Sequence, residues 1–109
     1  MNPNFLKKDG ILAIQNGVVF LQKEELKMTQ DNLSPYFNNV TFYTAAVPTY
    51  VGGTMAFGFA SDNKKSLDIN AGVLKARLEN ISGSLKYYTP QIHRAAFALP
   101  LWVEEYIKN

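Results

Sequence analysis

The sequence predicts an α/β domain built like the second half of a doubly wound sheet. Three observations support this fold class. An apolar run at residues 11–14 follows a turn, a helical pattern covers residues 19–37, and two β-rich segments at 40–47 and 54–60 are joined by a short loop. A strand, a helix and then an antiparallel strand pair are typical of the end of such a sheet.

The composition is that of one small globular domain. The chain has 109 residues, of which 47% are hydrophobic and 18% charged, as in ordinary folded proteins. A net charge of +2 with scattered basic residues gives no reason to expect nucleic acid or a membrane surface as a partner. The absence of cysteine excludes disulfides and thiolate chemistry and fits a cytoplasmic location. No apolar run reaches the roughly 18 residues of a membrane span, and the first eight residues lack a signal peptide's apolar stretch.

The first strand is predicted at Ile11–Ile14, directly after a helix-ending turn at Gly10. Four consecutive apolar residues indicate a strand buried on both faces, as in a parallel sheet. The polar and flexible residues 15–17 end it. Ligands of open α/β sheets bind beyond the C-terminal ends of strands, which makes Gln15 a candidate ligand contact. The alternative is a polar strand end without a binding role.

A helix is predicted over residues 19–37. Leu26, Leu33 and Phe37 share one face, and the charged side chains point elsewhere, as in a helix with one side on the core. The residue before a proline avoids helical backbone. Because Ser34 precedes Pro35, we expect the helix to end or kink near Leu33.

The strongest strand signal is Val40–Val47, which is rich in β-branched and aromatic residues. Neither face of it is strongly polar, so we expect it at the centre of the sheet. Pro48 ends its pairing, and a loop leads to a second strand at Thr54–Ala60. One face of this second strand carries large apolar side chains and the other only small ones. The short loop predicts an antiparallel hairpin.

Short helices are predicted for the rest of the chain. Apolar residues at helical spacing indicate a surface helix with one buried stripe that stops at Gly83. Thr89 is a candidate N-cap, with Pro90 at the first helical position. Pro100 separates this helix from a last one at Leu101–Lys108, whose apolar residues are expected to pack inward. The spaced residues of the surface helix are Leu67, Leu74, Leu78 and Ile81.

The predicted sheet is incomplete. About three strands with helices are marginally stable, and a strand buried on both faces at residues 11–14 needs a neighbour on each side. We therefore expect an incomplete fold, a tight homo-oligomer or a partner chain, rather than a free monomer.

No self-sufficient catalytic or metal-binding motif is present. The pair Gly52-Gly53 precedes a strand instead of opening a helix, so it is not a nucleotide loop. The single histidine, His93, has no carboxylates grouped around it, which favours a structural role. The nine carboxylates lie at turns or on solvated helical faces, unlike a buried catalytic acid. Residue chemistry alone predicts a binding surface at most, with no catalytic residue, no metal and no cofactor.

Three motifs carry further information. Residues 6–15 read L-K-K-D-G-I-L-A-I-Q, residues 47–53 read V-P-T-Y-V-G-G, and residues 85–100 read L-K-Y-Y-T-P-Q-I-H-R-A-A-F-A-L-P. Together they resemble the signatures of the spermidine synthases, the polyamine aminopropyltransferases. The last motif is the most specific, and the similarity extends along nearly the whole chain.

The resemblance implies a Rossmann-like domain of the S-adenosylmethionine-methyltransferase kind. Such enzymes transfer an aminopropyl group from the co-substrate decarboxylated S-adenosylmethionine to putrescine, giving spermidine and methylthioadenosine. Tyr50 matches the family's tyrosine near the bound amine, and Gln15 matches a glutamine of the same pocket. For Tyr50 the alternative is a packed loop aromatic. We expect four further residues of the matched motif to have structural rather than binding roles, namely Tyr87, Tyr88, His93 and Arg94.

The sequence also departs from the family. The catalytic aspartates and the Gly-x-Gly-Asp-Gly-Gly-type loop of these enzymes lie upstream of the matched region. The resemblance therefore implies that residues 1–109 form the C-terminal part of the catalytic domain, without the N-terminal β domain and the first Rossmann half. Such a chain is expected to be inactive alone and to need an N-terminal half. Two alternatives remain, namely a non-catalytic oligomerising or regulatory module, and an aminopropyltransferase with another amine acceptor.

Overall fold

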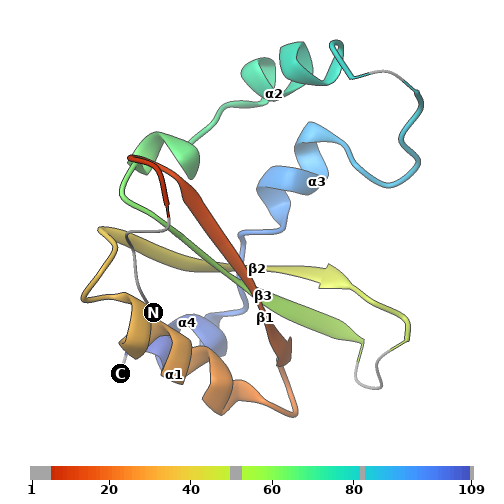
Figure 1. Cartoon of the computed structure of the whole chain (residues 1–109). Helices are drawn as coiled ribbons and strands as arrows, with labels where there is room; N and C mark the ends of the chain where they lie inside the picture. The colour runs from red at the N-terminus through yellow and green to blue at the C-terminus, as the bar shows by residue number, and fades with distance from the viewer. Residues whose placement is uncertain (1–5, 50–52, 82, 109) are drawn as a thin grey trace.

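The computed structural model describes residues 6–49, 53–81 and 83–108. A three-stranded sheet carries helices on both faces (Figure 1), which confirms the predicted α/β class. The elements in chain order are β1 (Ile11–Val18), α1 (Lys23–Leu33), β2 (Asn39–Ala46), β3 (Thr54–Ser61), the 3-10 turn η2 (Lys64–Ser66), α2 (Ala71–Leu78), α3 (Pro90–Ala95) and α4 (Leu101–Lys108).

β3 lies at the centre of the sheet, between β1 and β2. Both neighbours run antiparallel to it, so β1 and β2 run in the same direction. The predicted β2–β3 hairpin is confirmed, but the predicted central position of β2 is wrong. The small residues Ala56, Gly58 and Ala60 let α1 approach β3 closely, which makes β3 the strand buried on both sides. The outer edge of β2 instead donates a hydrogen bond from the Thr44 N–H to the Ala96 carbonyl (2.9 Å).

β1 corrects the prediction for the first strand in two ways. It continues to Val18, because residues 15–17 remain in the ladder with β3 through a β-bulge. It also lies at the sheet edge and is not buried on both faces, since Ile11 is 49% exposed. Leu12 and Ile14 pack towards the core, whereas Ile11 and Ala13 point to the other, more open face.

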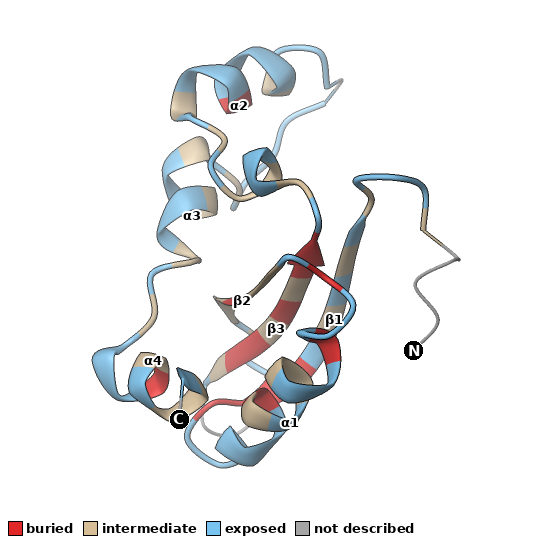
Figure 2. Ribbon diagram, turned by 90° about the vertical axis from the view of Figure 1, so that its left-hand side faces the viewer, coloured by how far each residue is buried: buried red, intermediate tan, exposed pale blue. Residues whose placement is uncertain are grey.

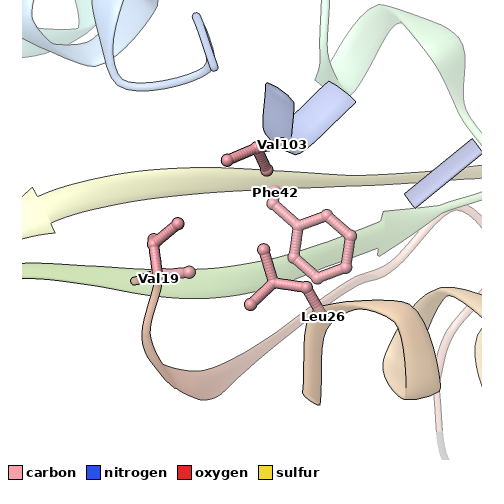
Figure 3. Packing of buried hydrophobic residues seen from close by; sticks show 5 residues of the cluster. Val19, Leu26, Phe42 and Val103 are labelled. Atoms are coloured by element: carbon pink, nitrogen blue, oxygen red, sulfur yellow. The ribbon is translucent and has the colours of Figure 1, made fainter. Parts of the chain in front are cut away.

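The core lies between the sheet and the pair α1 and α4. Leu26 of α1, Phe42 of β2 and Val103 of α4 meet there with Val19, and each is at most 3% exposed (Figure 3). Leu33, Phe37 and Ala60 form a second buried cluster under the end of α1. The face predicted for this helix is therefore confirmed.

The helix α1 is shorter than predicted at its start and ends as predicted. Val18 and Val19 belong to the core strand and turn, so the helix begins only at Lys23. It stops at Leu33, with the Ser34 N–H bonded to the Gln30 carbonyl (3.0 Å). Ser34 keeps helical backbone angles, and the helix ends because Pro35 has no N–H to continue its hydrogen bonds.

Aromatic residues cover the opposite face of the sheet. Tyr43 stacks on Phe57 with ring centroids 5.1 Å apart, and Phe97 contacts Tyr43 and Phe59 at 5.3 Å each. Phe97 follows α3 and holds that helix against β2 and β3. The predicted N-cap of α3 is confirmed, since the Ile92 N–H donates to Thr89 Oγ1 (3.0 Å).

The helix α2 stands apart from the sheet, beside α3, and is largely exposed (Figure 2). It spans eight residues, with Asn70 as its N-cap. Leu74 is its one buried residue, and Ile81 lies beyond it at 54% exposed. The predicted surface helix with one buried stripe is confirmed within α2, where Leu74 is buried and Leu78 half-buried, whereas Ile81 lies outside the stripe. The bounds predicted for α4 are confirmed, although Trp102 lies at the surface beside Phe20.

Within the three described ranges, no helix combines the length and the apolar character needed to cross a membrane.

Candidate functional site

The candidate site lies where β1 and β2 both end. Val18 of β1 and Ala45 of β2 flank Met55, the second residue of β3. The C-terminal ends of the two parallel-running strands therefore meet at one end of the sheet. The connection between β2 and β3 also leaves the sheet there (Figure 1). Such an end is the usual ligand position of an open α/β sheet.

Gln15 lies on the open, aromatic face of the sheet near this end. It pairs with Phe57 of β3, which in turn pairs with Tyr43 of β2. Residues directly opposite one another in antiparallel strands point to the same face. The exposed Gln15 carboxamide thus starts a row that continues with the stacked rings of Phe57 and Tyr43.

Tyr50 falls outside the described residues. The ends of its loop are placed, because the Val47 N–H donates to the Gly53 carbonyl (3.2 Å). These two residues continue the β2–β3 hairpin at the same end of the sheet as Gln15. The proposed contact of Tyr50 with an amine therefore stays a prediction.

A β-bulge follows Gln15 directly and was missed by the sequence reading. Gln15 pairs with Phe57 and Gly17 with Ala56, so Asn16 is the extra residue. Asn16 is 3% exposed, and its Oδ1 accepts a hydrogen bond from Thr29 Oγ1 (3.1 Å). The Asn16-Gly17 pair was the available signal, because glycine with positive φ is typical of a bulge as well as of a strand end.

A pocket of about 330 Å³ opens on the aromatic face, and the β1 residue in its lining is Ala13, two residues before Gln15. Its walls come from all three strands and from the segment that contains α3. One polar pair lies in it, Tyr88 Oη with His93 Nδ1 at 2.8 Å, and the His93 ring also contacts Phe97. These contacts tie the C-terminal segment to the sheet. Tyr87 is 63% exposed at the rim.

Among the described residues, those that line the pocket include no aspartate or glutamate that could hold a polyamine. Among the described residues, the buried polar side chains are those of Asn16 and Ser61, so no described carboxylate is buried. The same residues include no group of three or more potential metal ligands. The site offers amide, hydroxyl and aromatic groups, which can orient an amine but cannot neutralise its charge.

Fold and site together define an α/β unit of the kind that ends a Rossmann-like sheet, with a candidate ligand position at its strand ends. Comparison with known proteins makes this specific. Residues 2–71 match the family model described as spermine/spermidine synthase domain. The polyamine aminopropyltransferase of Klebsiella pneumoniae is 44% identical over 100 residues, which are 92% of this chain and 35% of the relative. That of Erwinia tasmaniensis is 45% identical over 98 residues, covering 90% and 34% of the two chains.

Solved structures agree with the sequence comparison. The spermidine synthase of Thermotoga maritima superposes with a TM-score of 0.80 at 26% identity, covering 94% of this chain and 36% of that one. A spermidine synthase in complex with the transition state analogue AdoDATO gives the same TM-score, with 94% and 35% covered. This chain belongs to the spermine/spermidine synthase family, and it spans about a third of the length of the relatives it matches.

Proposed function

We propose that this chain is the C-terminal part of a polyamine aminopropyltransferase of the spermidine synthase type. The observation that carries the proposal is the 44% identity that extends over 92% of the chain. It includes both the strand end with Gln15 and the hairpin loop with Tyr50. The proposed acceptor is putrescine, and the proposed co-substrate is decarboxylated S-adenosylmethionine, with no resident cofactor.

The reaction is a nucleophilic substitution. The lone pair of a deprotonated putrescine amine attacks the aminopropyl carbon beside the sulfonium. The carbon–sulfur bond breaks, its electrons neutralise the sulfur, and methylthioadenosine leaves, while the new secondary ammonium of spermidine loses a proton. Gln15 and Tyr50 would hold the amine by hydrogen bonds and orient its lone pair, which is the role of positioned groups in such a step.

The chain needs a partner for this chemistry. Binding a polyamine requires carboxylates, and the described part of the chain supplies none at the site. Among the described residues, β1 pairs with β3 alone, so its outer edge has free backbone donors and acceptors next to the exposed Ile11. We propose that the N-terminal part of a family domain docks on this edge and completes the sheet.

Complementation tests the proposal. The segment of the Klebsiella pneumoniae relative that precedes the matched region is produced separately and mixed with this chain. Putrescine and decarboxylated S-adenosylmethionine are added, and methylthioadenosine is followed by liquid chromatography. We expect turnover in the mixture and in neither part alone. Absence of both turnover and association would contradict the proposal.

A second candidate function is a non-catalytic oligomerising module. The exposed, apolar start of β1 favours it, because two copies could pair edge to edge. Sedimentation of the chain alone distinguishes the two. A stable homodimer that does not dissociate on adding the N-terminal segment would favour the module, whereas a heterodimer would favour the enzyme. A homo-oligomer that itself turns over putrescine would require another source of carboxylates.

We also propose a cytoplasmic location, on the ground that the 109 residues contain no cysteine. Detection of the protein in a cell fraction other than the cytoplasm would contradict it.

A further inference from the structure

The bulge beside Gln15 is the feature of the site that the proposed function leaves unexplained. We propose that Thr29 of α1, acting through Asn16, is a positioning residue that keeps the Gln15 carboxamide on the ligand side of the sheet. The inference rests on the proposed role of Gln15 in holding the amine. It adds a residue outside the site, on the opposite face of the sheet.

The position of the bulge decides which of two neighbouring carboxamides faces the ligand. Gln15 pairs with Phe57 on the aromatic face, and Asn16 points to the α1 side. If the bulge moved towards the start of β1, Asn16 would pair with Phe57 and Gln15 would turn towards α1. A shift of one residue exchanges the two faces of a strand. Gln15 and Asn16 differ by one methylene, so their own chemistry selects the register only weakly.

The hydrogen bond with Thr29 is what holds Asn16 inward. Asn16 is 3% exposed, and Thr29 Oγ1 donates to its Oδ1 at 3.1 Å. The Asn16 Nδ2 is also buried and has no hydrogen-bond partner among the described residues. A buried side-chain amide whose N–H group lacks a hydrogen-bond partner destabilises the folded state. Its presence is explained if the Thr29 contact serves to fix the register rather than to add stability.

The opposite strand is shaped to admit this pair. Gly58 of β3 faces it, and a Cβ on Gly58 would lie 3.1 Å from Ile14 Cγ1, 3.3 Å from Thr29 Cγ2 and 3.7 Å from Asn16 Nδ2. A Cβ there would crowd Ile14 and Thr29 and would be in ordinary contact with Asn16. Glycine at this position therefore leaves the space in which α1 reaches the bulge.

Gln22 makes a second set of contacts, on the C-terminal side of the bulge. The Val18 N–H donates to Gln22 Oε1 (3.0 Å), and the Gln22 N–H donates to the Val18 carbonyl (2.8 Å). Gly17 has a φ of 92°, and the Gln22 side chain lies directly over it. Gln22 fixes the backbone after the bulge, and Thr29 with Asn16 fixes the bulged residue itself. Together these contacts keep the Gln15 side chain on the aromatic face of the sheet.

The test replaces the Thr29 hydroxyl by a methyl group of similar size. Thr29→Val, Thr29→Ser and the exposed control Met28→Ala are compared in the complemented enzyme. We expect Thr29→Val to raise KM for putrescine about tenfold, the effect of losing one well-placed hydrogen bond. KM for decarboxylated S-adenosylmethionine should stay within about twofold, and Thr29→Ser and Met28→Ala should behave like the parent. An unchanged putrescine KM in a folded Thr29→Val variant overturns the proposal.

Thr29→Ala provides a second variant in case Thr29→Val fails to fold. It removes the same hydroxyl without placing a methyl group beside Asn16 Oδ1. The Asn16 side chain then loses its hydrogen-bond partner, and the putrescine KM should rise about tenfold, as in Thr29→Val. A putrescine KM that stays at the parent value in a folded Thr29→Ala variant contradicts the positioning role.

Nuclear magnetic resonance of the 109-residue chain alone separates this inference from the proposed function. Thr29→Val should shift the side-chain amide resonances of Gln15 and speed the exchange of the Val18 N–H. The resonances around Phe97 should not move. This outcome supports the positioning role of Thr29 even if no mixture turns over putrescine. In that case the proposed function is wrong while the role of Thr29 stands. If the Gln15 resonances of Thr29→Val do not shift, the positioning role of Thr29 is overturned whether or not the enzyme is active.

Discussion

Gln15 illustrates how a single residue is placed by its neighbours. A polar residue after an apolar run predicts a strand end, and the structure places Gln15 near the C-terminal end of β1. The strand nevertheless continues for three residues past Gln15. Gly17 and Gln22 make this possible, because they accept the extra residue without ending the ladder. Sequence periodicity does not reveal such a bulge, since the bulge depends on the side chain of Gln22, five residues after Gly17.

The proposed binding role of Gln15 gives the first prediction. Gln15→Ala should raise KM for putrescine about tenfold in the complemented enzyme, because one hydrogen bond to the amine is lost. Unfolding of the variant should match the parent, as the side chain is exposed. Gln91→Ala, at an exposed position on α3, is the control. Steady-state kinetics measure both, and equal effects from the two variants would remove Gln15 from the site.

The bulge glycine gives a second prediction. Gly17→Ala should lower the free energy of unfolding by about 2 kcal/mol, through its positive φ and through contact with the Gln22 side chain. A Cβ on Gly17 would lie 2.6 Å from Gln22 Oε1. Gly83 has a φ of 93° with open space around it, so Gly83→Ala isolates the backbone cost at about 1 kcal/mol. Urea unfolding followed by circular dichroism measures the difference. Equal losses of unfolding free energy in the two variants would mean that the Gln22 side chain moves away from the new Cβ without cost.

At the scale of elements, the local signals were reliable and the sheet positions were not. Ser34-Pro35 ended α1, Thr89-Pro90 started α3, and Pro100 separated α4, as predicted. Each of these depends on backbone chemistry within a few residues. The central place of β3 and the exposure of α2 depend on which surfaces are available elsewhere in the chain. Apolar spacing at Leu67 to Ile81 predicted the face of α2 that carries the buried Leu74, but it did not predict that Ile81 is exposed.

The attachment of α3 to the sheet gives a prediction at this scale. Phe97 packs on Tyr43, Phe59 and His93, so Phe97→Ala should cost about 2 kcal/mol, less than for a fully buried phenylalanine. Hydrogen exchange should show that the amides of α3 lose protection while those of α1 keep theirs. Leu101→Ala, at a residue that is 69% exposed, should change neither. Equal loss of protection in α1 would mean that the two faces of the sheet unfold together.

At the scale of the whole molecule, the sheet has a closed side and an open side. α1 and α4 bury one face, while the aromatic face and the outer edge of β1 stay accessible (Figure 2). An edge strand with an apolar, exposed start is normally covered or protected by charge. The N-terminal part of a family domain, which is proposed above to dock on β1, would provide this cover.

The β1 edge gives the prediction for the assembly. Ile11→Lys should weaken binding of the N-terminal segment at least about tenfold, because a charge at a strand edge opposes pairing. The isolated chain should keep its stability, as Ile11 is 49% exposed. Ile81→Lys, in the segment after α2, is the matched control at 54% exposed. Isothermal titration calorimetry measures both, and equal affinities would exclude the β1 edge as the docking surface.

The central claim is that this chain carries part of an aminopropyltransferase site and needs the rest for turnover. The most direct measurement is methylthioadenosine formation by the purified 109-residue chain, given putrescine and decarboxylated S-adenosylmethionine. We expect no product above the rate without protein, because the described residues gather no carboxylates around the site. Product formation by the chain alone would contradict this account and would mean that the groups holding the polyamine and the nucleoside are already present within it.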